Sequence, residues 1–521
     1  MTFTPRDTPR GLRRRRVRLT ALLVAVLLVL GVGGWLGSRW LDARGARCHG
    51  LDSTEGEGYA LSLAGDQCIG WIVEEDHAFG STDERVNAVI TAVVKENQRV
   101  HDQAGRTGGT PYVRIAVLMP MTSREGSAMR DNEVLHALQG AYAAQRQANQ
   151  GRSVLGDPTP QVQLVLANEG RDQEHWAPVV RQLGALRGGD HPLVAVTGMG
   201  ISIDATKQAA DELGRLQIPA VGAVLTADDM TSPLLFKTTP SNAQYTLALK
   251  AFLDGSPKRT EPAKRTGYLL FDRNQDKYVQ SLRAAFTTTF GEEYGLKGRS
   301  GGFNGSASPN GTPLLLSELV QDVCAAKPDV LFFAGRGRDI DDLMQALALR
   351  TGCREPDDPL IVATGATGIS IEPQALDEAN AILLNAAATD TRAWLAGEPG
   401  TPKHFGEFRT WFAGLGFAED DLRDGYAIMH HDAVAATVWA ARRAARSIEA
   451  VEGQRLKNED VGQHLYSSTT DLVPGASGEI YFAENPPNDR WPIGKPIPVL
   501  KSGPRSDTLT TGPVYLTQPK A

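Results

Sequence analysis

The sequence predicts an α/β protein with parallel sheets and two doubly wound lobes that face each other across a cleft. From Pro192 to Met230 a short apolar run leads through a glycine-rich turn into a helix, and Pro219 ends that helix before a second strand. Such a βαβ unit requires parallel strands with the helix packed on the sheet. Strands and helices alternate in the same way from Val113 to Ala363. A short internal repeat, TGMGISI from Thr197 and TGATGISI from Thr364, favours two similar lobes.

Length and composition narrow the class of protein. A chain of 521 residues is long enough for two or three domains. Its hydrophobic content of 41% and charged content of 22% are ordinary for a globular protein. The net charge of −7 argues against nucleic-acid binding, which needs a basic surface. Arginine far outnumbers lysine and alanine and glycine are abundant, which suggests a bacterial source with a GC-rich genome.

The N-terminus has the features of a single-pass membrane anchor. A basic tail, residues 1–18, contains the run Arg13–Arg16, and the uncharged apolar stretch Leu19–Leu36 follows it. At 1.5 Å per residue this stretch spans about 27 Å as a helix, roughly the hydrocarbon core of a bilayer. The arginine cluster predicts a cytoplasmic tail, an anchor over residues 19–41 and an extracytoplasmic remainder. A cleaved signal peptide is the alternative, but it has a shorter apolar region and a small-residue cleavage site.

The four cysteines are expected to form disulfides, because the chain after the anchor lies in an oxidising compartment. Of the three possible pairings, we expect Cys48–Cys68, from proximity, and Cys324–Cys353. The helices on either side of the strand Asp329–Ala334 both run against it, so they end at one edge of the sheet and bring Cys324 and Cys353 together there. No two cysteines have the close spacing of a zinc site.

Apolar runs predict the strands, and apolar residues at a helical period predict the helices. Residues 42–111 are expected to be a preface, a disulfide-pinned hairpin followed by a helix over Thr82–Gln103. The further expected elements are, in order, Val113–Met119, Glu133–Gln150, Val162–Ala167, Trp176–Leu186, Leu193–Val196, Ala205–Leu216, Ala220–Leu225, Leu235–Pro240, Tyr245–Leu253, Gly267–Phe271, Tyr278–Phe290, Leu314–Ala325, Asp329–Ala334, Ile340–Arg350, Leu360–Ala363, Leu383–Ala387, Phe405–Phe412, Ala427–Glu449, Gly475–Phe482 and Pro498–Leu500. The Pro- and Thr-rich tail, 501–521, is expected to be flexible.

Six segments in order resemble the type I periplasmic-binding-protein family, in its leucine/isoleucine/valine-binding branch. They are VRIAVLMPMT, IPAVGAVLTADDM, LLFKTTPSNAQYT, LFFAGRGRDIDDLMQAL, GYAIMHHDAV and ASGEIYF, and the resemblance covers about Tyr112–Leu500. Proteins of this family have two α/β lobes joined by three crossings and close on a small ligand without chemistry. The resemblance implies lobe 1 at 112–241 and 385–476, and lobe 2 at 242–384 and 477–500.

The resemblance also implies ligand contacts in lobe 1. Ser202 lies in the loop that holds the acidic end of the ligand in this family, and Gly200 belongs to the same turn. Thr226 matches a hydroxyl with the same role, while Thr122 and Ser123 lie in the first cleft loop. Loop amides and hydroxyls suit a carboxylate. In the alternative interpretation these hydroxyls only satisfy backbone groups at helix starts and in loops.

In lobe 2 the resemblance implies that Tyr278 is a cleft tyrosine and that Asp339 binds the ammonium group of an amino acid. Asp339 is also at a position typical of a helix N-cap. The chain departs from the family by carrying Arg336 and Arg338 beside the cleft. These arginines are either solvated loop charges or clamps for an anion.

No motif of an enzyme occurs. Gly335-Arg336-Gly337 lacks the third glycine of a dinucleotide loop, and neither a P-loop lysine motif nor HExxH is found. We expect no cofactor, and no metal, because the pair His430-His431 has no further ligands at suitable spacing. The expected function is that of a membrane-tethered extracytoplasmic solute-binding protein, which binds an amino-acid-like ligand by lobe closure and delivers it to an ABC permease. The alternative is an anchored sensor that signals to a partner without transport.

The uncleaved anchor is directly testable. Intact-mass measurement of the membrane-extracted protein should give the full chain, because Leu19–Leu36 is long and no small-residue cleavage site follows it. A mature chain that begins at Cys48 and carries a lipid would contradict the anchor and indicate a lipoprotein.

Overall fold

The computed structural model describes Cys48 and most of the chain from residue 55 to residue 518. The gaps are 57, 75–78, 125, 128, 152, 256–264, 275, 306–312, 352, 354, 356, 370, 450–454, 467–471, 483–489 and 510–513. The expected basic tail and membrane anchor, residues 1–41, lie outside the described residues. Within the described part, no helix combines the length and the apolar character needed to cross a membrane.

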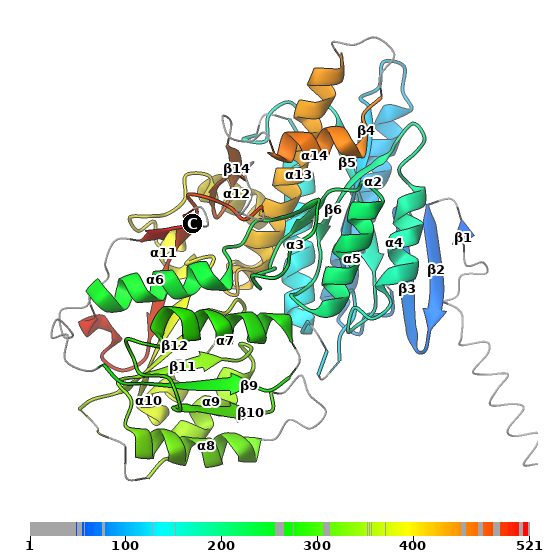
Figure 1. Ribbon diagram of the computed structural model, residues 1–521. Helices are drawn as coiled ribbons and strands as arrows, with labels where there is room; N and C mark the ends of the chain where they lie inside the picture. The colour runs from blue at the N-terminus through cyan, green and yellow to red at the C-terminus, as the bar shows by residue number, and fades with distance from the viewer. Residues whose placement is uncertain are drawn as a thin grey trace, which may run out of the picture.

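Two separate sheets form the cores of two lobes (Figure 1). The lobe 1 sheet has the order β1-β2-β3-β5-β4-β6-β7-β8, in which β4 to β8 are parallel and β1 to β3 are antiparallel. Its strands are β1 (Glu55–Gly56), β2 (Tyr59–Ala64), β3 (Gln67–Ile72), β4 (Tyr112–Met119), β5 (Gln161–Asn168), β6 (Leu193–Gly198), β7 (Ala220–Gly222) and β8 (Leu235–Lys237).

Helices cover both faces of the lobe 1 sheet, which explains why its parallel strands are almost continuously apolar. One face packs against α2 (Glu84–Ala104), α3 (Asp131–Asn149), α13 (Tyr426–Glu449) and α14 (Asn458–Tyr466). The other packs against α4 (Trp176–Ala185) and α5 (Asp204–Arg215). A satellite cluster against α3 and α13 contains α11 (Thr391–Leu395), α12 (Phe405–Gly414) and the short helix η3 (Glu419–Leu422).

The lobe 2 sheet has the order β10-β9-β11-β12-β13-β17, with only β17 antiparallel to its neighbour. Its strands are β9 (Gly267–Asp272), β10 (Ser300–Phe303), β11 (Val330–Ala334), β12 (Leu360–Thr364), β13 (Ala381–Ala386) and β17 (Val499–Ser502). One face packs against α6 (Asn242–Gly255) and α7 (Lys277–Phe290), the other against α8 (Pro313–Ala326), α9 (Asp339–Ala348) and α10 (Pro373–Ala379). The prediction of an α/β fold with parallel sheets is confirmed.

The hairpin and helix that precede β4 are integral to lobe 1. Strand β3 pairs antiparallel with β5, so the hairpin extends the sheet at its edge. The buried Asn97 of α2 fixes that helix to the sheet, because its amide donates to the carbonyls of Val73 and Leu164 at 2.8 and 2.7 Å. Its side-chain oxygen accepts the Leu164 amide at 2.9 Å. A buried polar side chain satisfied in this way fixes the helix in one position.

Both predicted disulfides, Cys48–Cys68 and Cys324–Cys353, are present. The first joins the chain before β1 to strand β3, and the second joins the end of α8 to the segment after α9. The common-edge argument for the second bridge therefore holds.

Several expected segments differ from the observed structure, and three of them show why. Strand β7 ends at Gly222, not Leu225, because the Leu225 side chain folds back over Gly222, where a Cβ would meet it at 2.5 Å. The expected strand Gly475–Phe482 is a hairpin instead, β14 (Val473–Gly475) with β15 (Gly478–Ile480). In the tail, β18 (Tyr515–Leu516) pairs with β16 (Pro496–Ile497), and η4 spans Ser506–Thr508.

A buried charged cluster lies where the chain passes between the lobes. Lys495, which precedes β16, is fully buried, and its ammonium donates to the Thr238 carbonyl and to the Ser477 hydroxyl, both at 2.6 Å. Asp432 of α13, also fully buried, accepts hydrogen bonds from the Ser477 hydroxyl and amide and from the Ala476 amide. The cluster thus ties the segment that leaves lobe 1 after β8 to the segment that enters lobe 2 before β17.

We expect Asp432→Asn to destabilise the fold by about 3–5 kcal/mol in urea unfolding at pH 7, because it leaves the buried Lys495 ammonium without an anion. Burial raises the pKa of Asp432, but hydrogen bonds and the charges of His431 and Lys495 outweigh it, so its pKa lies below the ordinary 3.8. Its contribution is therefore complete above pH 3.8 and is lost as the pH falls through the lower folded value. Wild type and variant should converge in acid.

The matched control is Asp420→Asn, since the Asp420 side chain is 75% exposed. It should change the free energy of unfolding by less than about 0.5 kcal/mol. Equal effects of the two substitutions would contradict the role given to the buried cluster.

Candidate functional site

A pocket lies between the lobes, at the carboxyl ends of the parallel strands of both sheets. Ligands bind at this edge in open α/β sheets. The pocket has a cavity volume of about 40 Å³. Its lining is Arg130, Glu133, Ile201, Ser202, Val224, Thr226, Tyr278, Arg336, Gly337, Arg338, Ala366, Thr367 and Tyr426. Lobe 1 supplies the loops after β6 and β7 and the starts of α3 and α13, and lobe 2 supplies the loops after β11 and β12 and the start of α7.

The lobe 1 wall is a rigid turn. Gly198, Met199 and Gly200 all have positive φ angles, of 84°, 65° and 57°. A Cβ on Gly200 would lie 2.4 Å from the side chain of Gln173, so the close approach requires glycine. The turn places the Ser202 hydroxyl where it accepts the amide of Thr226 at 3.0 Å.

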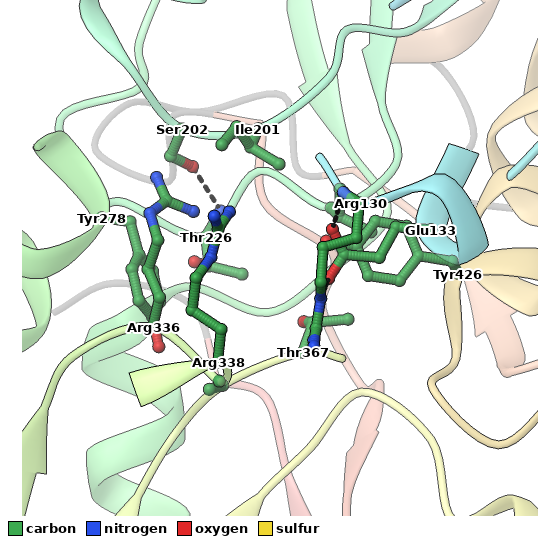
Figure 2. A pocket seen from close by; sticks show the side chains of 13 residues that line it. Arg130, Glu133, Ile201, Ser202, Thr226, Tyr278, Arg336, Arg338, Thr367 and Tyr426 are labelled. Atoms are coloured by element: carbon green, nitrogen blue, oxygen red, sulfur yellow. Dashed lines mark hydrogen bonds and ion pairs between the residues drawn. The ribbon is translucent and has the colours of Figure 1, made fainter. Parts of the chain in front are cut away.

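The lobe 2 wall is formed by an aromatic ring and two guanidinium groups. The Tyr278 hydroxyl donates to the Gly365 carbonyl at 3.1 Å, so it binds the protein, and burial raises its pKa. Arg336 lies over the Tyr278 ring, 5.6 Å from its centre. Figure 2 shows the side chains of Arg336 and Arg338 rising from lobe 2 toward Ser202 of lobe 1.

Arg336 is held by an ion pair within lobe 2. Its Nε donates to Asp276 Oδ2 at 2.7 Å, and the other oxygen of Asp276 accepts the Tyr278 amide at 2.9 Å as the N-cap of α7. Burial alone would lower the pKa of Arg336, but the charge of Asp276 outweighs it, and the pKa is raised. For Arg338, burial and the charge of Arg336 lower the pKa.

The start of α3 contributes a further arginine that the sequence analysis did not identify. The Arg130 amide donates to Glu133 Oε2 at 2.9 Å, and its Nε donates to Oε1 at 3.3 Å. Its Nη2 reaches across the cleft to the Gly368 carbonyl at 3.1 Å. The signal in the sequence was Glu133, three residues after Arg130 at the end of the first cleft loop, which is the spacing of a helix N-terminus. Tyr426, at the start of α13, was also missed.

Four of the eight predicted ligand-binding residues line the pocket, and Arg338 does so too. These four are Ser202, Thr226, Tyr278 and Arg336. The predicted residues that do not line it are Thr122, Ser123, Gly200 and Asp339.

Two of these other residues have clear structural partners. Ser123 donates to Asp131 at 2.6 Å, at the start of α3. Asp339 is 2% exposed, and its Oδ2 accepts the Arg336 amide at 3.2 Å. It is the first residue of α9, whose N-cap is Arg338. The Asp339 carboxylate therefore lies behind the loop that carries the arginines.

The lobes contact each other directly around the pocket. The Tyr278 amide of lobe 2 donates to the Ser202 carbonyl of lobe 1 at 3.2 Å. At the rim, the Lys277 ammonium lies 2.7 Å from Asp229 and 3.2 Å from Asp204. On the opposite side, Arg338 donates to the Ser127 carbonyl at 2.8 Å. The structure is thus that of a closed cleft.

The histidine pair does not contribute to the pocket. His430 and His431 are each 1% exposed, and Nε2 of His431 lies 2.7 Å from the amide oxygen of Gln147. Burial lowers the pKa of His430 to about 4. Both are therefore part of the packing of lobe 1.

The backbone resembles solved structures of bacterial and related solute-binding proteins. The leucine-binding protein LivK of Thermotoga maritima aligns with a TM-score of 0.51 at 17% identity, over 75% of this chain and 99% of its own. The branched-chain amino acid transporter substrate-binding protein LivJ of Streptococcus pneumoniae, solved with isoleucine, aligns with a TM-score of 0.53 at 14% identity, over 78% and 100%. An extracellular ligand-binding receptor of Rhodopseudomonas palustris aligns with a TM-score of 0.52 at 14% identity, over 73% and 94%.

These likenesses define the class of fold. The chain has the two-lobed fold of the type I periplasmic binding proteins, as the resemblance in the sequence implied. A scan against protein-family models finds no match, and a search of curated proteins finds none either.

The pair Arg336–Asp276 can be separated from the helix cap by two substitutions. Asp276→Asn keeps the N-cap of α7 but removes the charge, so it should lower the free energy of unfolding by about 3 kcal/mol, as for a buried pair that loses one partner. Asp276→Ala removes the cap as well and should cost about 1 kcal/mol more. Urea unfolding of both variants measures this. Equal stability of Asp276→Asn and wild type would show that the pair is not buried enough to matter.

Proposed function

We propose that this protein is an extracytoplasmic solute-binding protein that closes its two lobes around a small polar ligand with an anionic group, without chemistry. The observation that carries the proposal is a pocket lined by both lobes at the carboxyl ends of their strands and crossed at its edge by the hydrogen bond from Tyr278 to Ser202. A ligand in this position touches lobe 1 and lobe 2 only when the cleft is closed. Its binding energy therefore favours closure.

The two walls have complementary tasks. Lobe 1 offers the hydroxyls of Ser202 and Thr226 in a turn whose glycines hold a fixed shape. Lobe 2 offers the guanidinium groups of Arg336 and Arg338. Guanidinium groups and hydroxyls are strong partners for a carboxylate. The rim contacts of Lys277 then add an ion pair between the lobes that forms only on closure.

We further propose that the apolar stretch Leu19–Leu36 tethers this domain to the outer face of the cell membrane, and that the closed form delivers its ligand to an ABC permease. LivJ, named above, is the substrate-binding protein of a branched-chain amino acid transporter, and this chain is similar to it in fold. The uncleaved anchor favours a second candidate, a sensor whose closure signals to a membrane partner. Co-purification of the tethered protein with a permease would support transport. Ligand-dependent crosslinks to a membrane protein that is not a permease would support sensing.

The proposal is tested by screening small solutes against the full-length chain. A true ligand at 100 times its Kd should stabilise the folded state by about 2.7 kcal/mol, because it binds only the native protein. The same solute should change the small-angle scattering of the protein in the direction of a more compact shape. Thermal shift without any change in scattering would contradict lobe closure.

A blocking variant and its control make the screen specific to the pocket. Thr367→Trp puts a large side chain into the lining and should abolish the thermal shift. Thr410→Trp lies at an exposed position of α12 and should leave it unchanged. Equal binding by both variants would place the ligand elsewhere.

A further inference from the structure

We infer that the ligand of this pocket is a small carboxylic acid that lacks an ammonium group, in preference to the matching α-amino acid. The inference rests on the proposed function and specifies its ligand. It is carried by an excess of positively charged over negatively charged side chains in the pocket lining, and by the way in which the acidic side chains there are already used.

The charges in the lining are mostly positive. Among the described lining residues there are three guanidinium groups, those of Arg130, Arg336 and Arg338, against one carboxylate, that of Glu133. Both lobes contribute to the positive side, since Arg130 starts α3 and the other two follow β11. Figure 2 shows these groups around one central space.

The carboxylates at the pocket are occupied by protein donors. Both oxygens of Glu133 accept hydrogen bonds from Arg130. Asp276, behind the lining, pairs with the guanidinium of Arg336, and Asp339 accepts the backbone amide of that same arginine. A ligand ammonium would have to share these oxygens with the arginine donors and would lie among three guanidinium groups, and a buried charge close to like charges is costly.

The Ser202 hydroxyl is also available as a donor toward the ligand. Ser202 is 2% exposed, and its oxygen already accepts the amides of Thr226 and Ala227 at 3.0 and 3.3 Å. A hydroxyl that accepts two hydrogen bonds keeps its own proton to donate. Because Ser202 lines the pocket, a ligand oxygen there can accept this proton.

Thr367 supplies a second, independent observation on the opposite wall. Thr367 lines the pocket, and its hydroxyl oxygen is buried. The nearby Tyr245 hydroxyl interacts with it, and this contact lowers the pKa of Tyr245 against the larger, opposite effect of burial. A hydroxyl has one proton and two lone pairs, so Thr367 can contact Tyr245 and still bond to a ligand atom in the pocket. A carboxylate oxygen can accept from both walls at once.

The size of the pocket limits the acid to a short chain. The cavity volume of about 40 Å³ corresponds to roughly three water-sized spheres. Short mono- and dicarboxylic acids match this space, with the longer ones requiring the arginine side chains to shift. Large aromatic or branched ligands do not match the closed form.

The test compares acids with amino acids that differ from them by a single ammonium group. Calorimetry on the full-length chain uses propionate against alanine and succinate against aspartate. The acid of at least one pair should bind about tenfold or more tightly than its amino acid, because the ammonium would lie among three guanidinium groups. Equal or tighter binding of the amino acids would overturn the inference and leave the proposed function intact.

Two lining variants and one control assign the effect to the pocket. Arg338→Gln and Thr367→Val should each weaken binding of the preferred acid, the first by about 10-fold to 150-fold, as expected for a hydrogen bond to a charged group. Arg423→Gln is the control, because its side chain is 70% exposed and pairs with Asp420 outside the pocket. Unchanged affinity in both lining variants would overturn the inference.

Failure of the ligand class and failure of the proposed function give different results. If none of the four probes binds while a neutral solute from the screen closes the lobes, the ligand class is wrong and the function stands. If no solute at all closes the lobes, the proposed function is wrong, and the ligand class is wrong with it.

Discussion

The arrangement of the two lobes depends on the buried ammonium of Lys495. A buried charge is tolerated only when it is paired and hydrogen-bonded, and Lys495 meets that condition through Thr238, Ser477 and, beyond the Ser477 hydroxyl, Asp432. These groups come from separate stretches of the chain, which must therefore stay together. Breaking the cluster would leave the buried ammonium without its partners, so we expect a movement that separates the pocket walls to keep the cluster intact.

The pocket follows from the same placement. Since both sheets direct the carboxyl ends of their parallel strands toward the junction, the loops after β6, β7, β11 and β12 converge on one space. The resulting walls offer guanidinium and hydroxyl donors. The acidic side chains bind within the protein, where Asp276 caps α7 and Glu133 holds Arg130. The fold thus uses its carboxylates to position the arginines, and in the function proposed above the arginines determine the charge that the pocket accepts.

Much of this architecture could be predicted from local pattern. The βα alternation, the parallel strands and the pairing Cys324–Cys353 follow from periodicity and from the direction of helices beside a strand, which are short-range properties. The site was predicted only in part. Four predicted residues line the pocket, Ser202, Thr226, Tyr278 and Arg336. Arg130 and Tyr426 could not be found, because their place in the lining depends on how the starts of α3 and α13, which are far apart in the sequence, lie beside lobe 2.

The sequence by itself determined the α/β class, the succession of strands and helices, and both disulfides, because each rests on residue types and spacing within one segment or two adjacent ones. Only the tertiary structure decided how the acidic groups are used. Asp339 looks like a ligand group in the sequence, but in the fold it accepts the Arg336 amide behind the lining. Contacts between loops determine which carboxylate faces a pocket, and such contacts leave no periodic pattern in the sequence.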